Sequence, residues 1–370
     1  MENVKRQEKP EGPLRRGWTT GACATAATKA ALTALLTGRF PDPVAIRLPK
    51  GETPSFALAL EGAGEGFALA GIVNDAGDDP DVTHLATIVS TVRFGAPGSG
   101  VTFAAGEGVG TVTKPGLPVA VGEAAINPVP RAMMTEIVET LCAEHGRPAD
   151  IEITISVPGG EEMARHTWNP RLGIVGGISI LGTTGVVHPF SCSAWIQSIH
   201  SGVDVCRANG VAHVLGATGS TSEAAAQKLH DFPEIALLDM GDFACGLLKY
   251  LREHPIQRLT IAGGFAKLTK LAQGALDLHS GRSQVDMDWL AEEASRLGAD
   301  TELAGRIRRA NTAMEVLDMA REKGIGLPAA IAGKALSTCR KALRDAPVRV
   351  EIVIVSRGGD ILARLSEAGF

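Results

Sequence analysis

The sequence is poor in aromatic residues and has no long apolar run. Only 4% of its 370 residues are Phe, Trp or Tyr, so the base-stacking platforms of single-strand nucleic-acid binders are not expected. No run reaches the roughly 18 apolar residues of a membrane span, and the polar first 16 residues lack the apolar core of a signal peptide. The net charge of −5 also argues against general nucleic-acid binding. We therefore expect a cytoplasmic protein that binds neither nucleic acid nor membrane.

Several familiar motifs are missing as well. The six cysteines are scattered without a C-x-x-C pair, which is typical of free thiols in a reducing compartment. No G-x-S-x-G, H-E-x-x-H or Walker loop is present, which counts against hydrolases, metalloproteases and P-loop enzymes. We expect no protein-bound metal. The oligomeric state is left open, and a homo-oligomer is compatible with the sequence.

The length favours two domains. We interpret residues 1–16 as a flexible arm and residues 17–165 as an α+β domain with a mainly antiparallel sheet. Thr19 or Thr20 is expected to cap a helix over 22–36. The remaining predicted elements are a helix over 132–145 and strands over 44–48, 56–60, 67–73, 84–94, 101–105 and 151–157.

Residues 166–370 have a different pattern, in which strands alternate with helices. This alternation predicts an α/β, Rossmann-like domain with a parallel sheet and a helical C-terminal part. The predicted strands are 211–215, 234–238, 258–262 and 348–355, and the predicted helices are 222–230, 243–253, 266–276 and several within 287–345.

A glycine turn follows the first of these strands, at Gly216, Thr218 and Gly219. Backbone N–H groups at the start of the next helix attract a carboxylate or phosphate. Asp239 ends the second strand, where an acid can accept hydrogen bonds from ribose hydroxyls. The pattern suits an adenosine-containing ligand, although Gly216-x-x-Gly219 is an incomplete fingerprint and a tight packing turn needs glycine anyway.

A second glycine cluster contains Gly182, Thr183 and Thr184. Its small hydroxyls and backbone donors, near the start of a helix, could also bind a cofactor. A hinge between domains explains the same residues equally well.

An acidic turn spans residues 74–81 and carries four carboxylates, including Asp75 and Asp78. Packing like charges raises some pKa values, which suits acid–base catalysis. A divalent cation is a second interpretation, and ordinary Asx-turns are a third.

Five cations lie within glycine-rich or apolar motifs, where a solvated surface charge is unexpected. Each could form a structural salt bridge, but together they predict an anionic ligand with several acid groups. His279, expected at the end of the helix over 266–276, is a candidate for proton transfer, or a helix cap. The five cations are Lys114, Arg131, Arg171, Lys267 and Lys270.

Eight segments, in order along the chain, resemble the CbiD family, the cobalt-precorrin-5B C1-methyltransferases of cobalamin biosynthesis. The segments are residues 17–24 (GWTTGACA), 75–83 (DAGDDPDVT), 108–117 (GVGTVTKPGL), 122–131 (GEAAINPVPR), 169–174 (NPRLGI), 176–185 (GGISILGTTG), 267–272 (KLTKLA) and 279–280 (HS).

The resemblance implies methylation of a cobalt-corrinoid tetrapyrrole at C-1, with S-adenosylmethionine as the methyl donor. Under this interpretation Thr19, Thr20 and the five cations bind a substrate rich in carboxylates, and Asp75, Asp78 or His279 transfers any proton. Asn74, Phe265 and Leu278 depart from the residues expected there, Lys, His and Thr. A cobalt-free precorrin substrate, a nicotinamide-dependent oxidoreductase and a non-catalytic tetrapyrrole carrier are the alternatives.

Overall fold

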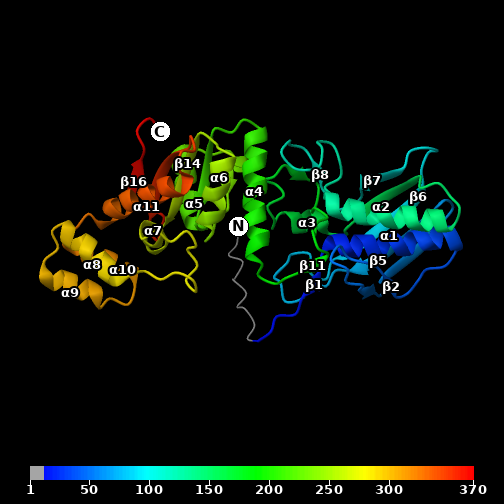
Figure 1. Ribbon diagram of the computed structural model, residues 1–370, viewed down its shortest axis with the longest axis horizontal. Coiled ribbons are helices and arrows are strands. Elements are labelled where there is room, and N and C mark those ends of the chain that lie inside the picture. Colours follow the sequence, from blue (N-terminus) through cyan, green and yellow to red (C-terminus); the bar gives the residue numbers. More distant parts are fainter. Residues whose placement is uncertain (1–11) are drawn as a thin grey trace. The chain divides into compact units, whose positions relative to one another are not determined.

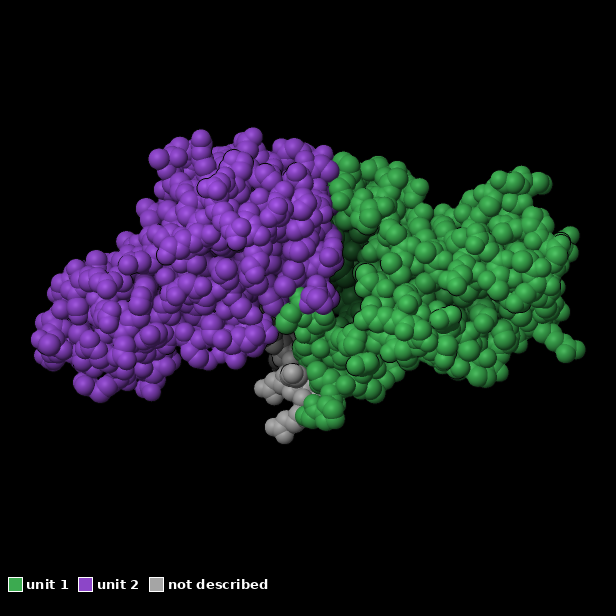
Figure 2. Space-filling view, viewed as in Figure 1, with its two compact units in different colours: residues 1–192 green, residues 193–370 purple. Residues whose placement is uncertain are grey.

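The computed structural model describes residues 12–370, and the chain divides into two compact units, residues 1–192 and 193–370 (Figure 2). The sequence predicts a boundary after residue 165. The observed boundary lies later than the predicted one because residues 166–192 contain short strands that pair with earlier strands of the first unit. Ile174–Val175 (β10) pairs with Thr111–Val112 (β8), and Val186–Val187 (β11) pairs with Gly17–Trp18 (β1). Most of the predicted arm, residues 1–11, lies outside the described residues.

The first unit contains a five-stranded sheet in the order β4-β5-β6-β9-β7. All neighbours are antiparallel except β7 and β9, so the predicted mainly antiparallel sheet is confirmed. The predicted strand 56–60 is divided between β3 and β4, and strand 44–48 is shortened to β2, which pairs with β3. The elements are Val44–Ala45 (β2), Ser55–Phe56 (β3), Leu60–Gly64 (β4), Phe67–Val73 (β5), Thr87–Phe94 (β6), Val101–Ala105 (β7), Ile151–Ser156 (β9) and Gly160–Ala164 (α3).

One alanine-rich helix, Thr20–Thr37 (α1), lies on β5 and β6 beside Pro128–Glu144 (α2) (Figure 1). Thr19 caps it, as predicted, because its Oγ1 accepts the N–H of Ala22 at 3.2 Å. Gly38, with a φ of 77°, ends it. The small side chains are buried almost all around the helix, so the sheet and α2 approach its backbone closely.

The second unit is built on a sheet in the order β13-β12-β14-β15-β16. Its first four strands are parallel, which confirms the predicted parallel sheet, and β16 joins antiparallel. β16 is absent from the prediction, and the predicted strand 234–238 is a 3-10 turn over Glu234–Ala236 (η1) followed by a two-residue strand. The strands are His213–Ala217 (β12), Leu237–Leu238 (β13), Arg258–Gly264 (β14), Arg349–Val355 (β15) and Ile361–Ser366 (β16).

The helices of the second unit largely follow the prediction. One helix, α4, is absent from it, and α7 ends at Ala272 rather than at residue 276. The helices are Cys192–Ala208 (α4), Ser220–His230 (α5), Ala244–Glu253 (α6), Phe265–Ala272 (α7), Met287–Arg296 (α8), Thr301–Arg308 (α9), Ala313–Glu322 (α10) and Leu327–Leu343 (α11).

The winding of the chain reverses at β12. The chain runs through α5 to β13, and then returns past β12 through α6 to β14. Because such crossovers are right-handed, the reversal places helices on both faces of the sheet. The carboxyl ends of β12 and β14 therefore lie at a topological switch point, the position where open α/β sheets bind ligands.

Candidate functional site

Two segments that contain glycine and threonine, residues 19–21 and 181–185, contact each other in the first unit. The hydroxyl of Thr20 accepts the N–H of Leu181 at 3.0 Å and donates to its carbonyl at 3.3 Å. A β-carbon added at Gly182 would lie only 2.2 Å from Thr19 Oγ1, so a larger residue cannot fit without displacement. The predicted substrate residues Thr19 and Thr20 thus meet the predicted cofactor segment at a tightly packed junction.

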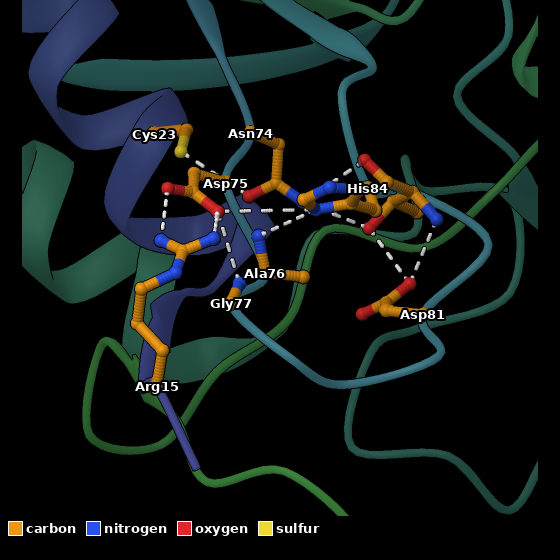
Figure 3. Close-up of polar contacts among 9 residues, drawn as sticks. Arg15, Cys23, Asn74, Asp75, Ala76, Gly77, Asp81 and His84 are labelled. Carbon is orange, nitrogen blue, oxygen red and sulfur yellow. Dashed lines mark hydrogen bonds and ion pairs between the residues drawn. The ribbon is translucent and has the colours of Figure 1, made fainter. Parts of the chain in front are cut away.

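The predicted acid–base residues Asp75 and Asp78 both bind Arg15, and Figure 3 shows the contact of Arg15 with Asp75. The guanidinium of Arg15 donates to Asp75 through Nη1 to Oδ2 at 2.5 Å and through Nη2 to Oδ1 at 2.8 Å. The backbone N–H of Arg15 donates to Asp78 Oδ2 at 2.6 Å. The hydrogen bond from Arg15 lowers the pKa of Asp75 against the opposing effect of burial. Asp75 is therefore held as an anion rather than as a proton donor.

The other carboxylates of this turn are also engaged. Asp79 Oδ1 accepts the N–H of Phe190 at 2.7 Å, and its pKa is raised, mainly by burial. Asp81 Oδ1 accepts both the N–H and the hydroxyl of Thr83 at 2.8 Å, as in an Asx-turn. The ring of His84 lies 3.9 Å from Asp75. These contacts favour the Asx-turn interpretation of the acidic segment.

Residues 15–18 run directly alongside residues 75–78. The N–H of Trp18 donates to the carbonyl of Asp75 at 2.7 Å, and the N–H of Asp78 donates to the carbonyl of Arg15 at 3.0 Å. Gly77 has a φ of 70°, and a β-carbon there would lie 2.3 Å from the Arg15 carbonyl oxygen. The backbones can approach this closely only because glycine occupies position 77.

Asn74, a departure from the family pattern, is a buried structural residue. Its Nδ2 donates to the carbonyl of Thr83 at 3.0 Å and to the hydroxyl of Thr83 at 2.9 Å. Its Oδ1 accepts from Cys23 Sγ at 3.3 Å (Figure 3). Burial raises the pKa of Cys23 to about 12, so this thiol stays a donor. A neutral amide therefore joins α1 to the acidic turn.

Arg131, a predicted substrate cation, is occupied by its own unit. Nη1 lies 2.9 Å from Glu123 Oε2, Nε donates to the carbonyl of Ile126 at 2.8 Å, and Nη2 donates to that of Ala124 at 2.9 Å. These contacts fix the turn before α2, so the position of the guanidinium is set by structural partners.

Lys114 differs from Arg131. Its methylene groups lie over Gly173, where a β-carbon would be 2.6 Å from Lys114 Cγ. Among residues 12–370 its ammonium group makes no hydrogen bond or ion pair. Arg171 lies over the ring of Trp168 at 5.2 Å. Of the three predicted substrate cations in the first unit, Lys114 is therefore the one most available to an added anion.

The glycine turn of the second unit lies at the switch point. Gly216 belongs to β12, and the N–H of Thr218 donates to the carbonyl of Ala262 in β14 at 2.9 Å. Gly219 is the N-cap of α5, has no side-chain cap, and a β-carbon there would meet nothing within 4 Å. Gly219 thus supplies no side-chain acceptor to the first N–H groups of α5, an arrangement that suits a carboxylate or phosphate.

Lys267 joins the loops that follow β12, β13 and β14. Its ammonium donates to the carbonyl of Thr218 at 2.9 Å and lies 2.8 Å from Asp242 Oδ1. From the sequence, Lys267 was expected to bind the substrate, and Asp242 was not recognised as a site residue. The available signal was a second acid three residues after Asp239, in the same loop.

Asp239 directly follows β13 at the same edge of the sheet. Its carbonyl accepts the indole N–H of Trp195, from α4, at 2.9 Å. The indole ring is exposed and lies next to Gly241. Trp195 was also overlooked, because the helix that carries it was not predicted. The edge therefore presents acids, backbone donors and an aromatic face together.

Two further predicted residues lie near α7. Lys270 is buried, its ammonium donates to the carbonyl of Leu278 at 3.0 Å, and burial lowers its pKa. His279 is exposed in a turn, where its Nδ1 accepts the N–H of Gly281 at 3.1 Å. The prediction that His279 ends the helix is wrong, because α7 stops seven residues earlier, before Gly274 with its φ of 97°.

The predicted cofactor residues thus fall into two groups. Gly182, the exposed Thr183 and Thr184, whose hydroxyl bonds to the backbone of Val186, belong to the first unit. The others lie at the carboxyl edge of the second sheet. We take this edge as the candidate functional site, and its residues are Gly216, Thr218, Gly219, Asp239, Asp242 and Lys267.

Two absences within residues 12–370 bear on the type of site. No group of three or more His, Cys, Asp or Glu side chains there is arranged to hold a metal ion. No helix in the same part of the chain has the length and apolar character needed to cross a membrane.

Known proteins resemble the chain over nearly all its length. Residues 6–189 match the CbiD family, and residues 277–366 match the CbiD C-terminal domain. Proteins of Brucella anthropi and Brucella canis, each named cobalt-precorrin-5B C(1)-methyltransferase, are 70% identical over 98% of both chains. The crystal structure of a cobalamin biosynthesis protein (CbiD) from Archaeoglobus fulgidus is 29% identical to this chain in sequence. The match covers 74% of this chain and 84% of that protein, with a TM-score of 0.40. The chain therefore belongs to the CbiD family, as its motifs predicted.

Proposed function

We propose that this protein methylates C-1 of cobalt-precorrin-5B, giving cobalt-precorrin-6A, and takes the methyl group from S-adenosylmethionine. The names of its Brucella relatives support the reaction. The methyl donor is supported by one observation in particular. The uncapped start of α5, Asp239 and the Lys267–Asp242 pair meet at the carboxyl edge of a parallel sheet, and we propose that this sheet acts as a Rossmann-like, adenosine-binding domain.

Three parts of the donor, which are the ribose, the methionine carboxylate and the sulfonium, have a matching group at this edge. The ribose hydroxyls would donate to Asp239, and the carboxylate of the methionine part would accept from the N–H groups at the start of α5. Asp242 adds a carboxylate that favours the positive sulfonium electrostatically. Lys267 is a positioning residue, because it fixes the turn after β12 and the loop that carries Asp242.

The methyl transfer is an in-line displacement. The electron pair of C-1 forms the new carbon–carbon bond while the methyl–sulfur bond breaks, and S-adenosylhomocysteine leaves. Such a step depends on positioning and electrostatics more than on a reactive side chain. Asp75, Asp78 and His279 stay predictions as proton-transfer residues, and the partners of the two aspartates favour a structural role.

The donor site is tested by calorimetric titration of S-adenosylmethionine into the Asp239→Ala variant. Loss of charged hydrogen bonds of about 1.5–3 kcal/mol predicts a 10- to 100-fold rise in Kd. Glu234→Ala is the matched control, because it removes the same charge from an exposed residue just before β13. Equal affinity in Asp239→Ala and wild type would remove Asp239 from the donor site.

For the tetrapyrrole, we propose that Lys114 binds a peripheral carboxylate, while Arg131 stabilises the surrounding turn. Lys114→Gln should raise the KM for the corrinoid about tenfold and leave the Kd of S-adenosylmethionine unchanged. Lys50→Gln, which removes an exposed charge from the same unit, is the control. If donor affinity falls together with corrinoid affinity, Lys114 acts through the fold.

The rival functions are separated by one incubation. Labelled S-adenosylmethionine and precorrin-5B, with and without cobalt, should give a product heavier by one labelled methyl group, and the cobalt dependence identifies the substrate form. An oxidoreductase would instead bind NADPH and transfer no label. A carrier would bind the corrinoid but show no affinity for S-adenosylmethionine.

A further inference from the structure

A second polar site lies at the amino ends of the strands in the sheet of the second unit. A cavity of about 500 Å³ opens where β14 and β15 begin, and Arg258, Arg340, Arg349 and Phe370 form much of its wall. Its volume is in the range of small-molecule sites. We call it the arginine pocket. The donor site proposed above lies at the carboxyl ends of the strands, so the two sites are separate.

The arginine pocket carries more positive than negative charge. Three guanidinium groups line it, and the carboxylate that accompanies them is that of Glu367, 3.2 Å from Arg340 Nε. Glu367 is shared, because its other oxygen accepts the N–H of Val350 at 2.7 Å. Among the side chains, one shared carboxylate accompanies three guanidinium groups, so the side chains of the wall carry a net positive charge.

Arg340 is incompletely satisfied. Its Nε is at ion-pair distance from Glu367 but without hydrogen-bond geometry, and its buried Nη2 has no acceptor. Buried guanidinium nitrogens normally have acceptors, so a missing partner here points to one that enters from the cavity. The other two arginines contact the last residues of the chain, since Arg349 donates to the carbonyl of Gly369 and Arg258 lies 6.0 Å from the ring of Phe370.

We propose that the arginine pocket binds a small polyanion through phosphate or carboxylate groups. Guanidinium forks match both groups in a bidentate manner. The ring of Phe370, which also packs against His213 at 5.1 Å, gives the pocket an aromatic side. The site thus selects a compact molecule with at least two acid groups.

Calorimetry with inorganic pyrophosphate and with citrate, each titrated into the full chain, tests the proposal. We expect saturable binding of at least one probe; the tighter probe identifies phosphate or carboxylate as the preferred group. Arg349→Gln and Arg258→Gln, tested separately, should each raise the Kd of the tighter probe about tenfold. Lys341→Gln, which removes an exposed charge from α11 outside the cavity, should leave the affinity unchanged.

Three results would overturn the proposal. One is the absence of binding by both probes, as expected if the chain's own terminal carboxylate fills the cavity. Another is unchanged affinity in both arginine variants, which would mean non-specific attraction. The third is an equal loss in Lys341→Gln. The affinity for S-adenosylmethionine, measured on the same samples, should not change, so a failure here is distinct from a failure of the donor site.

Discussion

His213 should make the second unit sensitive to acid. Its Nε2 lies 2.9 Å from Thr260 Oγ1, and the rings of His230, Phe232 and Phe370 surround it. Burial, followed by the nearby charges of His230 and Arg258, lowers the pKa of His213 from 6.5 to about 4. A proton on this ring therefore opposes the folded state.

The direction and size of the effect follow from proton linkage. Between pH 6.5 and 4 the unfolded chain binds a proton at His213 that the folded chain does not, so stability is full above pH 6.5 and falls as the pH decreases. A shift from 6.5 to about 4 corresponds to about 3 kcal/mol at most. Glu351, whose pKa is lowered through Arg364 and His230 against burial, adds a further loss below its ordinary value of 4.5. Burial also lowers the pKa of His200 in the second unit, so the His213→Gln variant is needed to separate the contribution of His213 between pH 6.5 and 4.5.

The assay is native-state hydrogen exchange of the β12 peptide, which reports on the second unit alone, at several pH values. Wild type should lose about 2–3 kcal/mol of opening free energy across the window. The His213→Gln variant should lose most of this pH dependence, with the remainder due to His200, whereas His188→Gln, in an exposed segment of the first unit, should match wild type. If the opening free energy of His213→Gln changes with pH as steeply as that of wild type, the assignment to His213 is refuted.

Three other predictions concern the first unit and the thiols. Gly77→Ala should lower the unfolding free energy by about 3 kcal/mol or more in urea titrations, because it combines backbone strain with a clash. Gly98→Ala, with a φ of 80° and open space, should cost about 1–2 kcal/mol; equal losses would exclude the clash. Asn74→Ala should cost about 1–3 kcal/mol by the same measurement, since the buried Cys23 thiol loses its acceptor and the carbonyl and hydroxyl of Thr83 lose a donor. Iodoacetamide at pH 8, followed by mass spectrometry, should label the half-buried Cys192 and Cys245 first, because burial raises the pKa of three other thiols to about 12; early labelling of a buried thiol would contradict this.

The regular elements could be predicted because their signals are local. The apolar runs and glycine turns located β12, α5 and β14. The type and position of Thr19 and Thr20 narrowed the cap of α1 to these two residues, and the structure shows that it is Thr19. The two-residue strands β1, β8, β10 and β11 have no local signal, since each exists only through pairing with a distant partner. Their pairing is also why the unit boundary lies at residue 192.

Part of the candidate site was also predictable from local signals in the sequence. The turn at residues 216–219 and Asp239 follow strands directly, so strand prediction located them. The roles of charged residues depend on partners that the sequence does not reveal. Arg131 and Lys267 appeared as ligand-binding cations, but the structure pairs them with Glu123 and Asp242. Four aspartates in one turn suggested repulsion between their carboxylates. In the structure Arg15 and backbone N–H groups donate hydrogen bonds to these carboxylates and so stabilise their charges.

The pairing of β1 with β11 has a consequence for synthesis of the protein. Gly17 is paired with Val187, so 170 further residues must be added before this strand finds its partner. At translation rates of about 5–20 residues per second, the interval is about 10–30 s. The packing partners of α1, which are β5, β6 and α2, are complete by residue 144, whereas the partners of β1 and β8 are still missing at that point. The helical core of the first unit can therefore form before the strands that close it have been made.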